Sequence, residues 1–179
     1  LKLYLRVMQN SFVVLQNGSL LDTSFNPNLY SFVNITTSTT GASVTSLTSF
    51  SLDMNAGLLH LTFNDVVNAS TFVASGVIIQ NAIYRAPNYF YQLTLGSYTQ
   101  SQDGYFITVL LSDQDLNQIK VTPDLATRTA DTWITCSAET LKDVNGINIL
   151  ATTNGNAIMA YELTPDTTPP HISNFTLDL

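Results

Sequence analysis

The chain has 179 residues, which is enough for one domain with a sizeable core and some additional segments. Hydrophobic residues make up 45% of it, which excludes a disordered chain, and charged residues only 11%, so its polar surface consists mainly of Ser, Thr, Asn and Gln. The formal net charge of −7 argues against nucleic acid or an anionic membrane as partner, and no apolar run approaches the roughly 20 residues of a membrane span.

The N-terminal part is strand-like and then becomes rich in Ser and Thr. Residues 1–21 begin with "LKLYLRVM", whose apolar residues favour a strand, and residues 36–46 read "TTSTTGASVTS". We therefore expect terminal strands over 1–21 and a Ser/Thr-rich linker over 22–45.

The clearest β signal lies in residues 46–63, "SLTSFSLDMNAGLLHLTF". Leu59, Leu61 and Phe63 alternate with polar or smaller neighbours, and "DMNAG" (53–57) supplies turn residues. This pattern predicts a β-hairpin.

Later segments repeat the β signal, with one interruption. In residues 112–131, Ser112 can cap a helix whose first turn holds Asp113 and Asp115, and Pro123 should end or split it. Short strands with regular turn signals predict an all-β, immunoglobulin-like β-sandwich with one short helical segment near 112–126, flanked by partial repeat strands. The further strands are expected at 71–81, 88–96, 104–111, 131–137 and 156–163.

Two segments of the chain repeat earlier or later patterns. Residues 171–179, "HISNFTLDL", align on 46–54, "SLTSFSLDM", and residues 8–21 align more weakly on 136–149, sharing an Asn-Gly pair. The repeat predicts tandem units. We expect residues 1–21 to end a partial preceding unit, 46–163 to form a complete unit, 164–171 ("TPDTTPPH") to be a Pro/Thr-rich linker, and 172–179 to be the first strand of a following unit or a donor strand.

The linker "DTTPPHISNFTLDL" (166–179) and the hairpin "GLLHLTFNDVVNASTF" (57–72) resemble bacterial-type Ig-like repeats of very large surface adhesins. They are also similar to repeats in long extracellular glycoproteins of algae and protists, including mastigoneme-like surface-hair fibres. The resemblance covers about 46–179. It implies an extracellular or cell-surface β-sandwich with a structural or adhesive role, and it implies no catalytic residues.

Groups for catalysis are scarce. His60 is expected to face outward from a strand, His171 lies in the linker, and Cys136, the only cysteine, reads as a small buried hydrophobe. The only glutamates, Glu139 and Glu162, form no recognisable acid/base pair. We therefore predict no catalytic residues and no enzyme.

The sequence predicts no metal site and no cofactor. Asp113 and Asp115 are explained by helix capping, because the spacing of an EF-hand loop is absent. Calcium at the junctions between units stays open as an alternative, with Asp53, Asp166 and Asp178 as its candidate ligands.

Covalent glycans are the expected modification. N-x-Ser/Thr sequons occur about as often as the composition predicts by chance, so their positions carry more weight than their number. The candidate N-glycosylation sites are Asn17, Asn34, Asn68 and Asn174.

A strand without a sheet of its own invites pairing with another chain. The candidate assembly strand contains Ile172, Phe175, Leu177 and Leu179. We expect copies of the protein to polymerise head to tail by strand exchange into an extracellular glycoprotein filament. The alternatives are that the next unit follows in the same chain, or that the protein is an adhesin module that binds a glycan or protein. The candidate aromatic patch of such an adhesin is Tyr84, Tyr89, Phe90 and Tyr91, beside Arg85.

Overall fold

The computed structural model describes residues 12–34, 44–87, 89–169 and 176. The chain divides into two compact units, Leu1–Ser43 and Val44–Leu179. The units are described one at a time.

The first unit contains a β-hairpin. Strands β1 (Phe12–Leu15) and β2 (Ser31–Asn34) pair antiparallel, with Val13 opposite Val33. Between them, the Asp22 carboxylate accepts the backbone N–H groups of Ser24 and Asn26, at 2.8 and 2.9 Å, and so holds a tight turn. Strand β2 therefore lies inside the range 22–45 that the composition predicts as a linker.

The first sheet of the second unit is built around the predicted hairpin. Strands β3 (Leu47–Asp53) and β4 (Leu58–Asn68) pair antiparallel around the turn at residues 54–57, as predicted. The strand order is β12 (Glu162–Thr164), β3, β4, β8 (Gly104–Leu110) and β7 (Tyr98–Thr99), and β10 (Lys142–Asp143) pairs with the far end of β4.

A second sheet covers the apolar face of the first. Its order is β11 (Ile158–Met159), β9 (Trp133–Cys136), β5 (Val77–Gln80) and β6 (Phe90–Gln92). Leu59 and Leu61 of β4 and Ile79 of β5 are fully buried in one continuous core. Period-two alternation places these side chains on the inner faces. The predicted all-β fold is therefore confirmed, with layers like those of a sandwich. Its immunoglobulin-like topology stays a prediction.

The single helix of the described residues is α1 (Asp113–Val121). The Ser112 hydroxyl accepts the backbone N–H of Asp115 at 3.1 Å, which confirms Ser112 as the N-cap. The helix ends at Val121, because Thr122 is extended ahead of Pro123, and it is therefore shorter than the expected range 112–126.

Three predicted strands differ clearly from the observed ones. The strand expected at 88–96 is reduced to β6 (Phe90–Gln92). Residues 69–71 and 74–76 form the 3₁₀ turns Ala69–Thr71 and Ala74–Gly76, so the strand expected at 71–81 is reduced to β5. The strand expected at 156–163 is broken into β11 and β12, which belong to different sheets. Short 3₁₀ turns also cover Thr129–Asp131 and Ala138–Thr140.

Candidate functional site

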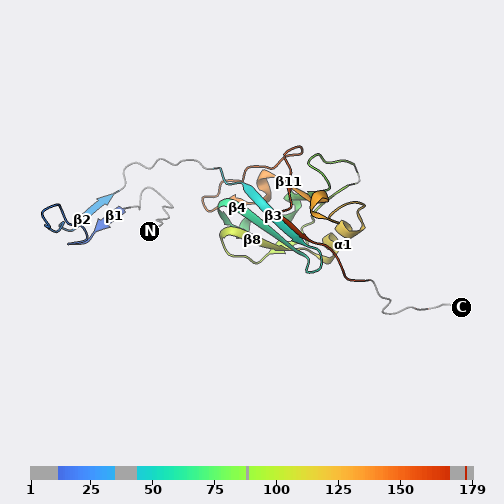
Figure 1. The fold of residues 1–179 in the computed structure, drawn as a ribbon, viewed down its shortest axis with the longest axis horizontal. Helices are drawn as coiled ribbons and strands as arrows, with labels where there is room; N and C mark the ends of the chain where they lie inside the picture. Colours follow the sequence, from blue (N-terminus) through green and yellow to red (C-terminus); the bar gives the residue numbers. More distant parts are fainter. Residues whose placement is uncertain (1–11, 35–43, 88, 170–175, 177–179) are drawn as a thin grey trace. The chain divides into compact units, whose positions relative to one another are not determined.

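The edge of the first sheet, where β12 lies beside β3, connects the two ends of the second unit. The two strands run parallel, with Leu163 opposite Leu52. Backbone N–H groups of Tyr161 and Met54 extend the contact on both sides of β12, donating to Phe50 O at 2.8 Å and Thr164 O at 2.9 Å. The chain thus enters the sheet at the start of β3 and leaves it at the opposite end (Figure 1).

Beyond β12, the chain is held against the unit by a group of contacts that we call the exit clasp: Asn55, Lys120 and residues 165–168. The Asn55 amide donates to Pro165 O at 2.9 Å, and its carbonyl oxygen accepts the backbone N–H of Thr167 at 3.0 Å. The Lys120 ammonium lies 3.0 Å from Asp166 Oδ2. The hydrogen bond from Lys120 also holds the pKa of the Asp166 carboxyl below its usual range.

Two of the three aspartates that the sequence suggests as calcium ligands already have partners within the chain. Asp53 Oδ1 accepts the backbone N–H groups of Asn55 and Ala56, both at 2.9 Å, and Asp166 binds Lys120. Asp178 lies outside the described residues. Among the residues that the structure describes, no group of three His, Cys, Asp or Glu side chains gathers where a metal ion could sit.

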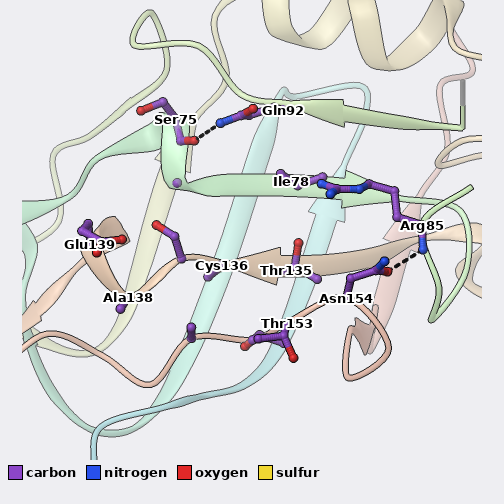
Figure 2. A pocket seen from close by; sticks show the side chains of 14 residues that line it. Ser75, Ile78, Arg85, Gln92, Thr135, Cys136, Ala138, Glu139, Thr153 and Asn154 are labelled. Carbon is purple, nitrogen blue, oxygen red and sulfur yellow. Dashed lines mark hydrogen bonds between the residues drawn. The ribbon is translucent and has the colours of Figure 1, made fainter. Parts of the chain in front are cut away.

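A groove of about 600 Å³ lies on the solvent face of the second sheet (Figure 2). Ile78 of β5 and Thr135 of β9 line it, and the loop that contains Thr153 and Asn154 forms one wall. Arg85 stands at one end of the groove and Glu139 at the other. The backbone N–H of Arg85 donates to Asn154 Oδ1 at 2.6 Å, so two loops far apart in sequence close the groove together.

The structure does not gather the four aromatic residues into one surface. Phe90 lies under the Arg85 guanidinium, 4.8 Å from ring centroid to Cζ. Tyr91, the next residue along β6, packs against the core instead and donates its hydroxyl to Asp115. Tyr84 is 69% exposed but lies against Gly155, and Tyr89 is exposed near the start of β6. The alternation along β6 thus separates Phe90 from Tyr91.

The sequon asparagines occupy different settings. Asn17 is exposed, and its side-chain oxygen accepts the backbone N–H of Tyr30. Asn68 is half-buried at the end of β4, and its side-chain oxygen accepts from the backbone N–H and the hydroxyl of Ser70, at 3.1 and 2.7 Å. Asn34 ends β2. Asn174 lies outside the described residues, as do His171 and the assembly residues Ile172, Phe175, Leu177 and Leu179.

Sequence reasoning missed a buried carboxylate. Asp115, a fully buried residue of α1, accepts hydrogen bonds from Tyr91 Oη at 2.9 Å, from the Thr94 backbone N–H at 3.0 Å and from the Thr94 and Ser97 hydroxyls. Burial alone would raise the pKa of Asp115, but the hydrogen bonds outweigh it and hold the pKa below its ordinary value. Its place in the first helical turn indicated a capping role and gave no sign of these partners.

Two other reactive side chains of the described residues are Cys136 and His60. Burial raises the pKa of the Cys136 thiol to about 12, which keeps it protonated at neutral pH. His60 is exposed on the first sheet, where its Nδ1 lies 2.9 Å from the Thr108 hydroxyl.

Comparison of the chain with models of protein families, with curated proteins and with solved structures found no match. No helix within the described residues has the length and apolar character to cross a membrane.

Proposed function

We propose that the protein is a structural subunit of an extracellular glycoprotein filament. In this filament, units join head to tail when residues 171–179 of one unit add a strand to the sheet of the next. The observation that supports the proposal best is the parallel pairing of β3 with β12. The chain enters β3 at one end of this strand pair and leaves β12 at the opposite end, so a force between the two ends of the unit acts along the strands.

The geometry of this edge suits a unit that carries tension. A force that pulls β3 back toward residue 44 and β12 forward toward residue 169 acts along both strands. The ladder hydrogen bonds between them are then strained together, whereas a force across the strands would break them one after another. Pairing of β12 with β3 is continued by the bond from Tyr161 N–H to Phe50 O, and a further bond joins Leu150 N–H to Thr45 O at 2.7 Å.

The exit clasp supports a defined junction. Asn55 and Lys120 fix the direction in which the chain leaves the unit through residues 165–168. A strand presented from a fixed direction loses less conformational entropy on docking than one on a free tether.

The hairpin of the first unit offers a second surface for assembly. Phe25 and Leu29, in the turn region between β1 and β2, are 81% and 82% exposed. A two-stranded hairpin is marginally stable in water on its own, and apolar side chains of this kind favour contact with another surface. Contacts made through two different surfaces of the chain, the hairpin and the added strand, are heterologous and generate an open filament.

The extracellular setting is supported by the composition and by the resemblance of the linker and hairpin to Ig-like repeats of surface proteins. A surface built from Ser, Thr and Asn, together with exposed Asn17, suits a glycosylated protein.

Electron microscopy of the purified full chain tests the proposal. Filaments are expected, and the double variant Phe175→Asp/Leu177→Asp should abolish them, because it places two charges on the apolar positions of the added strand. Two controls are needed because Thr176 completes the Asn174 sequon: Asn174→Gln removes the sequon alone, and Thr176→Asp removes it and also changes the intervening position. Both should leave filaments intact. Discrete monomers of the unmodified chain, or undiminished filaments of the double variant, would contradict strand exchange.

A further inference from the structure

The groove on the second sheet carries a positive charge that no carboxylate of the described chain neutralises. Within the described residues, one ion pair joins Lys120 to Asp166 and the other joins Arg128 to Asp131. Neither involves Arg85. Because the chain has only 6 Lys and Arg residues against 13 Asp and Glu, an arginine without a carboxylate partner stands out. Its guanidinium can bind a carboxylate through two parallel hydrogen bonds.

Contacts already hold Arg85 in place. Its guanidinium stacks on the Phe90 ring, which restricts the side chain while leaving its N–H groups able to bind. Its backbone is tied to Asn154, and the neighbouring bond from Gly155 N–H to Ile83 O, at 2.9 Å, joins the same two loops. A preformed site of this kind needs little ordering when a ligand binds.

Between its charged ends the groove is lined by uncharged polar side chains and by apolar residues, and the apolar atoms contribute the larger part of its surface. Its polar lining residues are Ser75, Gln92, Thr135, Ser137, Thr153 and Asn154. The Gln92 amide donates to Ser75 O, and the Ser137 hydroxyl lies 3.3 Å from the Thr140 hydroxyl. A hydroxyl both donates and accepts, so such a lining matches a ligand that carries several hydroxyls of its own. Ile78, Ala138 and Ala151 supply apolar surface against which the face of a sugar ring can pack.

The charges also limit the ligand. Glu139 at the far end repels a second negative group but can accept hydrogen bonds from hydroxyls. The protein as a whole, at a formal net charge of −7, repels polyanions. A phosphate dianion therefore fits less well than a single carboxylate attached to a polyhydroxylated ring.

We propose that this groove binds an acidic saccharide of the uronic acid class, with the sugar carboxylate on Arg85 and the sugar hydroxyls along the lining up to Glu139. Binding is independent of filament formation, because the groove lies on the second sheet and the exit clasp at the end of the first. A filament with one such site in each unit would bind a polyuronate chain at many points, which multiplies a weak affinity.

The proposal is tested by titrating the full chain with a galacturonic acid trisaccharide. Binding is measured from the NMR chemical-shift changes of the backbone amides. The free acid should bind with a dissociation constant on the order of 1 mM and move amides of the groove. The fully methyl-esterified trisaccharide has the same ring framework without the charge. Its affinity should be lower than that of the free acid by a factor of about ten or more. Equal binding of acid and ester, shifts outside the groove, or no binding of the acid would overturn the proposal.

Three variants and a small anion complete the test. Arg85→Gln should weaken binding of the free acid about tenfold and leave the weak binding of the ester unchanged. Lys142→Gln removes the same charge from an exposed position outside the groove and should change binding less than twofold. Thr153→Ala should weaken the acid and the ester alike. If acetate bound as tightly as the trisaccharide, the site would recognise a carboxylate alone and the saccharide assignment would be wrong.

Discussion

At the scale of single residues, Asp115 makes more contacts in the fold than its position in the sequence suggests. Its carboxylate joins the start of α1 to Tyr91 of β6 and to the loop that contains Thr94 and Ser97. A buried charge is tolerated only where such donors surround it. Asp113, two residues earlier, is exposed. The same residue type in the same helical turn therefore serves two purposes, and only the fold distinguishes them.

We expect Asp115→Asn to lower the free energy of unfolding by about 2 kcal/mol at pH 7, because it removes a charged acceptor from four hydrogen bonds. Asp113→Asn is the matched control and should change stability by less than about 0.5 kcal/mol. Denaturant unfolding of both variants measures the difference. A similar loss in the two variants would show that the hydrogen-bond network contributes little.

The lowered pKa of Asp115 also predicts acid sensitivity with a definite sign. Because its pKa in the folded protein lies below the unfolded value of about 3.9, its contribution is complete above that pH. The contribution is lost as the pH falls through the folded pKa. Between pH 5 and about pH 2, the free energy of unfolding should therefore fall more steeply with decreasing pH in the unmodified protein than in Asp115→Asn. Parallel curves would contradict the assignment.

At the scale of elements, β12 and the exit clasp form one continuous connection to β3 and its turn. Glu162–Thr164 add to the sheet beside β3, and the next residues are bound by Asn55 and Lys120. A Pro/Thr-rich composition would by itself predict a stiff but detached spacer. Residues 165–168 are instead attached, because the Asn55 side chain satisfies backbone groups at both Pro165 and Thr167.

Removal of the Asn55 side-chain amide should loosen the attachment of residues 165–168 to the second unit. We expect Asn55→Ala to raise the hydrogen exchange rate of the Thr167 amide about tenfold, since the bond it loses is worth about 1 kcal/mol or more. Asn117→Ala, at an exposed position of α1, serves as the control and should leave this amide protected. Unchanged exchange in Asn55→Ala would mean that the Lys120–Asp166 ion pair alone holds the segment.

At the scale of the whole second unit, the parallel contact of β3 and β12 predicts resistance that depends on the direction of pulling. Force applied between residues 44 and 169 shears the two strands, whereas force between Ala56 and residue 169 opens them from one end. The first geometry should require a higher unfolding force, because several hydrogen bonds must fail together. Single-molecule pulling through introduced cysteines measures both, since Cys136 is buried and protonated. Equal forces in the two geometries would remove the mechanical argument for the filament.

Part of this organisation could be read from local sequence. Alternating apolar residues in 46–63 predicted β3 and β4 with their turn, and Ser112 with Pro123 predicted the bounds of α1 within a few residues. The strand expected at 156–163 was less well predicted. Its apolar residues satisfy the alternation rule, yet Ala160 and Tyr161 form bonds to Thr132 and Phe50 that draw the two halves into different sheets. Long-range partners of this kind have no local signature.

The sequence by itself determined the all-β class, the hairpin and the capped helix, because these depend on residue alternation and on capping chemistry between near neighbours in the chain. Only the tertiary structure decided that β12 lies parallel to β3, that Asn55 holds residues 110 and more positions away, and that Arg85 meets Phe90 and Asn154 beside the groove. The physical reason is the same in each case. An amide or a guanidinium can bind any suitable partner, and which partner comes within hydrogen-bond distance is set by the packing of the two sheets.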